Sequence, residues 1–139
     1  MKKCRFHAYD SFWKKLPEAL FPTDKNVKKL IMKLCGSNYA VFTENADIMA
    51  HYKALLKGFR PMAMGFHRVE GFEGAQLDSI REKITFLVGR EDPFEKLGGE
   101  TALKENRMNA FFYEDAGHGL NHERADEINR KIVEILLGV

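Results

Sequence analysis

The sequence contains little cysteine, no long apolar run and almost no excess charge of either sign. Its 139 residues include two cysteines, Cys4 and Cys35, with no CxxC pair and no Cys/His metal spacing, which fits reduced structural thiols in the cytoplasm. No apolar segment follows the charged residues 1–5, so neither a signal peptide nor a membrane span is predicted. The 22 Lys and Arg against 20 Asp and Glu leave a net charge of +2. That balance argues against nucleic acid or an anionic membrane as a partner.

The first half of the chain is predicted to form short helices. Asp24 is expected to cap a helix that stops before Gly36, because apolar residues recur in it at positions i, i+3, i+4 and i+7. Asn45 is expected to cap a second helix, which Gly58 ends. The apolar faces of these two helices consist of Val27, Leu30, Ile31 and Leu34, and of Ile48, Tyr52, Leu55 and Leu56.

Further short helices are predicted on both sides of this pair. Residues 12–20 resemble a helix that is interrupted at Pro17. Pro61 is placed to begin another helix, whose apolar residues are Met62, Phe66 and Val69. Residues 76–83 are then expected to form a connection or a short helix.

The second half has the pattern strand, helix, strand, helix. Residues 84–88 are apolar and β-branched, which is typical of a strand buried on both faces, and Gly89 closes them. A weak helix near residues 100–106 precedes a second strand at 110–113. The last helix carries Ala125, Ile128, Ile132, Ile135 and Leu136 on one side. This alternation predicts an α/β fold with a parallel sheet, whose ligands gather beyond the carboxyl ends of the strands.

Two side chains with acid–base chemistry follow these predicted strands. Asp92 comes after the first strand in Gly-Arg-Glu-Asp-Pro, and His118 comes after the second in Ala-Gly-His-Gly. If the strands are parallel neighbours, both side chains emerge at one edge of the sheet. The carboxylate then accepts a hydrogen bond from one ring nitrogen, fixes the tautomer and stabilises the imidazolium. The pair is predicted to be an oriented general base.

A strand followed by VGREDP, then a second strand and AGHG before a terminal amphipathic helix, resembles the C-terminal part of the α/β-hydrolase superfamily. The resemblance implies that Asp92 occupies the acid position and His118 the base position of a catalytic triad. It also implies that residues 1–75 form a helical cap-like segment and residues 76–139 the last two strand-helix units of the core. The specific motifs lie between residues 84 and 123.

The sequence departs from that family at the nucleophile. The family places it in G-x-S-x-G at a turn from strand to helix, and no such motif occurs here. The serines are Ser11, Ser37 and Ser79, none of which follows a strand-like run between glycines, and Cys35 is expected to end a helix. The oxyanion hole, built partly by the residue after the nucleophile, is missing with it.

Simpler interpretations stand beside these. His118 and Asp92 are also typical turn residues, the latter before Pro93. His118, His122 and Glu123 form an alternative metal site, against which Gly119 argues because it interrupts a helix there. Asn121 or His122 is instead expected to cap the last helix, with Glu123 in its first turn. The cap-like stretch offers either an acyl pocket or ordinary helix packing, with the apolar residues Phe59, Met62, Met64 and Phe66.

The sequence therefore predicts a truncated or split serine-type hydrolase of a small ester, amide or related acyl compound, without a cofactor or metal, that is inactive as an isolated chain. The unpaired strand edges predict association with an N-terminal partner that supplies the nucleophile, or a homodimer. A non-catalytic interaction module, a degenerate hydrolase relic and a shifted reading frame are the alternatives.

Overall fold

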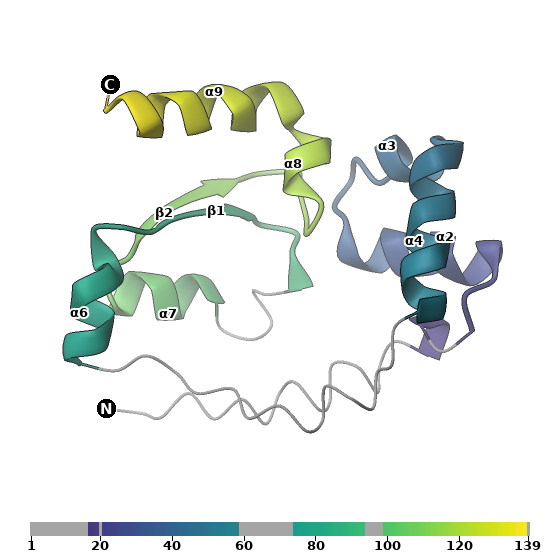
Figure 1. Ribbon diagram of the computed structural model, residues 1–139, viewed down its shortest axis with the longest axis horizontal. Helices are drawn as coiled ribbons and strands as arrows, with labels where there is room; N and C mark the ends of the chain where they lie inside the picture. Colours follow the sequence, from purple (N-terminus) through teal and green to yellow (C-terminus); the bar gives the residue numbers. More distant parts are fainter. Residues whose placement is uncertain (1–16, 20, 59–73, 94–98, 139) are drawn as a thin grey trace.

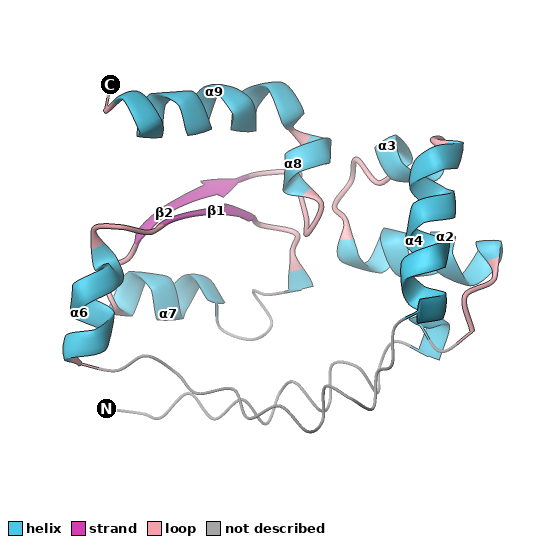
Figure 2. Ribbon diagram, viewed as in Figure 1, coloured by secondary structure: helices cyan, strands magenta, loops and turns pink. Residues whose placement is uncertain are grey.

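The computed structural model describes residues 17–19, 21–58, 74–93 and 99–138, which form an α/β structure that is mostly helical (Figure 2). In chain order its elements are η1 (Pro17–Ala19), α2 (Asp24–Leu34), α3 (Ala40–Thr43), α4 (Ala46–Gly58), α6 (Ala75–Arg81), β1 (Thr85–Gly89), α7 (Gly99–Glu105), β2 (Asn109–Tyr113), α8 (Leu120–Glu123) and α9 (Ala125–Leu137). The α/β class predicted from the sequence is confirmed.

The sheet consists of β1 and β2, which pair in parallel with Thr85 beside Asn109 and Gly89 beside Tyr113. Figure 1 shows α9 along one face of this sheet and α7 along the other, with α6 near the start of β1. The predicted burial of the first strand on both faces is only partly correct, because Val88 is buried whereas Phe86 and Leu87 are half-buried. The described sheet has two strands, so each strand has one edge that pairs with no other described strand. Most of its side chains are therefore only partly buried.

α2 forms with its predicted apolar face inward, and Val27, Leu30 and Ile31 are buried. The N-cap predicted for this helix, Asp24, was wrong by one position. Thr23 is the N-cap, and its side-chain oxygen accepts a hydrogen bond from the backbone N–H of Asn26 at 3.3 Å. Asp24 instead begins the helix, where a carboxylate favours the positive end of the helix dipole.

α4 begins after the cap predicted for it, since Asn45 Oδ1 accepts hydrogen bonds from the backbone N–H groups of Asp47 and Ile48 at 3.0 and 3.1 Å. Leu55 was wrongly placed on its apolar face and is 56% exposed. The core in this half is built on α2 and α3, with Phe42 fully buried and Tyr52 of α4 packed against it. The helices predicted for residues 12–20 and after Pro61 lie outside the described residues, apart from η1.

The start of the last helix also differs from the prediction. Neither Asn121 nor His122 caps it, because residues 120–123 form the separate turn of α8 and Arg124 stands at the N-cap of α9. Ile128 is buried, but Ile132 is 41% and Leu136 78% exposed. The apolar side of α9 is therefore covered only at its beginning.

The helical part (η1 to α4) and the sheet part (α6 to α9) are joined by hydrogen bonds to backbone carbonyl groups. The backbone N–H of His118 donates to Leu34 O at 2.9 Å, and Asn38 Nδ2 donates to Asp115 O at 3.0 Å. These bonds join the last residue of α2 and the segment that follows it to the loop after β2. The division into residues 1–75 and 76–139 stays a prediction.

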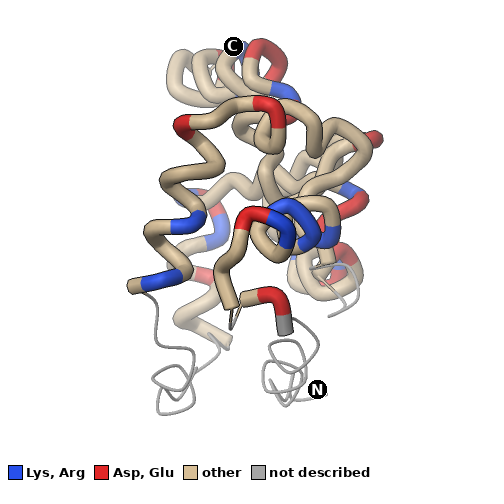
Figure 3. Tube along the Cα trace, turned by 90° about the vertical axis from the view of Figure 1, so that its right-hand side faces the viewer, with Lys and Arg blue, Asp and Glu red and all other residues tan. Residues whose placement is uncertain are grey.

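Charges of both signs are distributed over the helices (Figure 3), in keeping with the small net charge. The lysines of α2 at positions 25, 28, 29 and 33 are exposed. Among the helices that the structure describes, none combines the length and the apolar composition needed to cross a membrane.

Candidate active site

The candidate site lies beyond the carboxyl ends of β1 and β2. Because the strands are parallel, the chain leaves both of them at the same edge of the sheet. Backbone hydrogen bonds hold the loop after β1 against the loop after β2. Arg90 N–H donates to Tyr113 O at 2.9 Å, and Glu91 N–H donates to Ala116 O at 2.8 Å. The turn after β1 closes with Asp92 N–H donating to Gly89 O at 3.1 Å. Asp92 and His118 thus start from adjoining backbone.

The two predicted side chains are in contact, since Nδ1 of His118 lies 2.9 Å from Oδ2 of Asp92. An ionised carboxylate only accepts, so Nδ1 carries the proton and donates it in this bond, leaving Nε2 as the basic nitrogen when the ring is neutral. The His118 side chain is 67% exposed and that of Asp92 only 15%. The imidazole is therefore accessible and the acid behind it is largely shielded.

The environment of His118 favours its charged form. The hydrogen bond with Asp92 raises the pKa of the imidazole above its usual value, burial works in the opposite direction, and the negative charges of Asp92 and Glu123 add to the rise. An imidazole that holds a proton more strongly is a stronger base. The geometry and the charges around His118 thus agree with an oriented base.

The glycines on both sides of His118 are needed for close packing. A Cβ atom at Gly117 would lie 2.3 Å from the backbone nitrogen of Gly36, and one at Gly119 would lie 2.2 Å from Cζ of Phe42. Both distances are far below any real contact, so a larger residue at either position would push the loop away from the helical part. The Gly-His-Gly pattern therefore seats the loop and leaves the imidazole as its exposed group.

Glu123 was expected in the first turn of the last helix or at a metal, and its role as a hydrogen-bond acceptor for the His118 loop was not predicted. Its side chain is buried at 8% exposure, and Oε2 accepts hydrogen bonds from the N–H groups of Gly36 and Gly117, each at 3.0 Å. Oε1 accepts from Gly119 N–H, also at 3.0 Å. The local signal for this role was the glycine pair just before it, but the contact with Gly36 spans 87 positions and has no local signal.

The cysteine and serines of the described chain are not set up as the nucleophile. Burial, with the charge of Glu123 next in importance, raises the pKa of the Cys35 thiol to about 12, so it stays protonated and weakly nucleophilic. Ser37 Oγ donates to Glu91 Oε1 at 2.9 Å, and Ser79 Oγ donates to Gln76 O at 2.7 Å. Ser11 lies outside the described residues.

The alternative metal site is not assembled. The ring of His122 packs edge-to-face on Phe42 with centroids 5.3 Å apart, and the Glu123 carboxylate faces backbone N–H groups. Over residues 17–19, 21–58, 74–93 and 99–138, no three His, Cys, Asp or Glu side chains gather in a way that would hold a metal ion.

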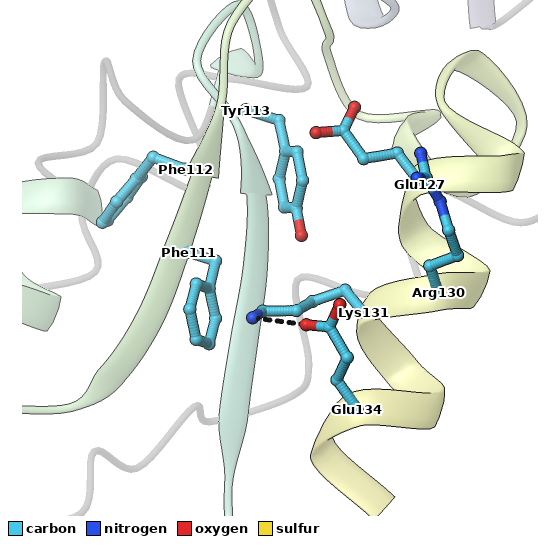
Figure 4. Close-up of a pocket in the computed structure, with 7 residues that line it drawn as sticks. All are labelled: Phe111, Phe112, Tyr113, Glu127, Arg130, Lys131 and Glu134. Carbon is cyan, nitrogen blue, oxygen red and sulfur yellow. Dashed lines mark hydrogen bonds and ion pairs between the residues drawn. The ribbon is translucent and has the colours of Figure 1, made fainter. Parts of the chain in front are cut away.

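A groove of about 360 Å³ lies elsewhere, between β2 and α9. Phe111 and Tyr113 face it from the strand, and the helix contributes charged side chains, among which Lys131 binds Glu134 at 2.9 Å (Figure 4). Neither Asp92 nor His118 lines this groove. The apolar residues considered for an acyl pocket, Phe59, Met62, Met64 and Phe66, lie outside the described residues.

Comparison of the chain with protein-family models, curated proteins and solved structures finds no match. The resemblance to α/β-hydrolases stays a prediction from the motifs between residues 84 and 123.

Proposed function

We propose that this chain contributes the general base, His118, and its orienting acid, Asp92, to a serine-type α/β-hydrolase of a small ester, amide or related acyl compound in the cytoplasm. The observation that carries this proposal is the 2.9 Å contact between the two side chains, made beyond the ends of two parallel strands. The order of acid and base along the chain supports the same family.

In this mechanism Nε2 of His118 removes the proton from a serine hydroxyl as that oxygen attacks the acyl carbon. The imidazolium that forms is stabilised by Asp92 and then gives the proton to the leaving group. In the second half-reaction the imidazole takes a proton from water, which attacks the acyl-enzyme, and His118 returns that proton to the serine. No cofactor is needed for these steps.

The nucleophile in this proposal comes from residues outside the sequence, on a segment that extends the sheet at β1. One side of α9 is charged and lines the groove with β2; its residues are Glu127, Arg130 and Glu134. Going around the helix in the opposite direction from the buried Ile128, the next apolar residues are Ile132 and Leu136. The open apolar side of α9 is therefore the one nearer β1. A further strand with its own apolar cover would bury that surface and pair the free edge.

Reconstitution tests this proposal. The chain is co-expressed with a nucleophile-bearing segment of an α/β-hydrolase, for which the DNA upstream of Met1 is the first source to sequence. The assembled protein is expected to hydrolyse p-nitrophenyl esters of short acids, and His118→Ala is expected to lower kcat by about 10⁶-fold, as loss of a triad histidine does. His51→Ala, at an exposed histidine on α4, is the matched control. Equal activity of His118→Ala and His51→Ala would refute the role of His118.

A non-catalytic interaction module is the second candidate, and the exposed apolar residues of α9 favour it, among them Val133 at 53% and Leu137 at 68% exposure. A fluorophosphonate probe separates the two. The hydrolase proposal expects labelling only after assembly, at a serine of the added segment. An assembled complex that stays unlabelled would favour the interaction module, and labelling of the isolated chain at Ser37 would show that the nucleophile lies within this sequence.

A further inference from the structure

Glu123 is a charged side chain buried in the described core. Burying a carboxylate is costly unless hydrogen bonds replace its lost water. Here three backbone N–H groups, those of Gly36, Gly117 and Gly119, replace it at 3.0 Å each. No Lys or Arg of the described residues forms an ion pair with it. The carboxylate is thus compensated by backbone that it also holds in place.

The three donors come from two distant parts of the chain. Gly117 and Gly119 stand on either side of His118, whereas Gly36 follows α2. The N–H of His118 itself donates to Leu34 O at 2.9 Å. The backbone is therefore fixed at residues 117, 118 and 119 in succession, and Glu123 provides two of those three anchors.

The exposure of His118 makes this anchoring important. At 67% exposure its ring has little packing to hold it in one orientation. What remains is the bond to Asp92 and the position of the backbone from which the ring extends. A loop that moves by about 1 Å removes a hydrogen bond of 2.9 Å, because such bonds weaken steeply beyond their usual range.

We infer that Glu123 is a positioning residue, which holds the His118 loop against the end of α2 by three backbone hydrogen bonds and so keeps the imidazole on Asp92. The inference rests on the proposed function only for its catalytic consequence, since the contacts exist without a nucleophile. The charge of Glu123 also raises the pKa of His118, by less than Asp92 does.

NMR titration of His118 in the isolated chain tests this inference. Glu123→Gln keeps the size of the side chain but replaces one acceptor oxygen by an N–H₂ group, which cannot accept from the backbone N–H groups of the glycines. The loop is then expected to shift, so that His118 leaves Asp92 and the pKa of His118 falls. Asp92→Asn is then expected to lower that pKa less in the Glu123→Gln background than in wild type, because coupled residues have non-additive effects. Glu127→Gln, an exposed carboxylate in the first turn of α9, is the matched control.

A purely structural role predicts a different result. Glu123→Gln would then lower the free energy of unfolding, while in the folded fraction the pKa of His118 fell only through the lost charge of Glu123 and the two substitutions had additive effects on it. That outcome would overturn the inference, as would an equal change in Glu127→Gln.

A measurement on the wild-type chain applies if Glu123→Gln does not fold. Hydrogen exchange of the amides of Gly36, Gly117 and Gly119 is expected to be slowed at least about tenfold relative to an open loop, since bonds to a charged acceptor belong to the stronger class. Exchange of these amides at open-loop rates would refute the three bonds. If reconstituted hydrolysis fails while the His118 coupling is present, the proposed function falls and the role of Glu123 stands.

Discussion

α2 and α9 have the same kind of amphipathic pattern but very different surroundings. Both are more than ten residues long and repeat apolar residues at positions i, i+4 and i+7 or i+8. In α2 the apolar side is closed, with Val27 at 0% and Ile31 at 1% exposure. In α9 only Ile128 is buried, at 4% exposure, whereas Leu136 is 78% exposed.

The difference lies in what covers each helix. α2 packs against α4 and against the buried Phe42 of α3. α9 lies over a sheet whose two strands are about 5 Å apart, although a helix with its side chains is about 10 Å wide. The pattern predicts which side of a helix is apolar, but the neighbouring elements decide whether that side is buried. The exposed apolar side of α9 is the surface that the further strand proposed above would cover.

The largest expected effect is at the closed core. Phe42→Ala removes a fully buried ring that contacts Tyr52 and His122 edge-to-face. We expect the free energy of unfolding to fall by about 3–5 kcal/mol, which is typical of a buried aromatic residue replaced by alanine. Urea denaturation followed by circular dichroism measures it. A loss of less than about 1 kcal/mol would mean that the helical core is loosely packed.

A smaller loss of stability is expected where the loop after β2 packs against Phe42 of the helical core. Gly119→Ala places a Cβ atom 2.2 Å from the Phe42 ring, and overpacking of this kind lowers the free energy of unfolding by about 1–3 kcal/mol. Gly58→Ala is the control, because a Cβ atom there meets nothing within 4 Å. It is expected to be neutral or stabilising, since alanine favours a helix over glycine. Equal effects at both glycines would contradict the close packing of the loop.

The His118–Asp92 pair is expected to contribute a small, pH-dependent stabilisation. The pKa of His118 is raised in the folded chain, so the contribution is fully present below the unfolded pKa and is lost as pH rises through the folded one. Because the ring is 67% exposed, we expect less than about 1 kcal/mol. Urea titrations of wild type and His118→Gln measure the difference, which should shrink from about pH 6 to about pH 9. A difference that grows over this range has the wrong sign for such a pair.

The smallest effect on folding is expected on the open side of α9. Leu136→Ser should change the free energy of unfolding by no more than about 0.5 kcal/mol, in contrast to Phe42→Ala. The same substitution should reduce association of the chain at high concentration, as measured by light scattering. If wild type stays strictly monomeric, the open side of α9 is not an association surface.

The sequence was informative wherever a contact is local or follows from strand order. The helices after Thr23 and Asn45, the parallel strands and the contact between Asp92 and His118 all follow from periodicity and topology. The shift of the cap from Asp24 to Thr23 is the usual uncertainty of one residue at a helix end.

Features that depend on distant residues were not predictable. Glu123 was assigned to the first turn of the last helix, because nothing near it indicates that Gly36 would supply an N–H group. The exposure of Leu55 and Leu136 likewise depends on which neighbours are present, and periodicity carries no information on that.

The oriented base is best tested by NMR titration of the His118 ring in wild type and in Asp92→Asn. We predict that the wild-type pKa lies above the usual value of histidine and falls when the carboxylate becomes an amide, with Nδ1 protonated in the neutral wild-type ring. The same pKa in both proteins, or a neutral ring protonated at Nε2, would show that the acid does not orient the imidazole.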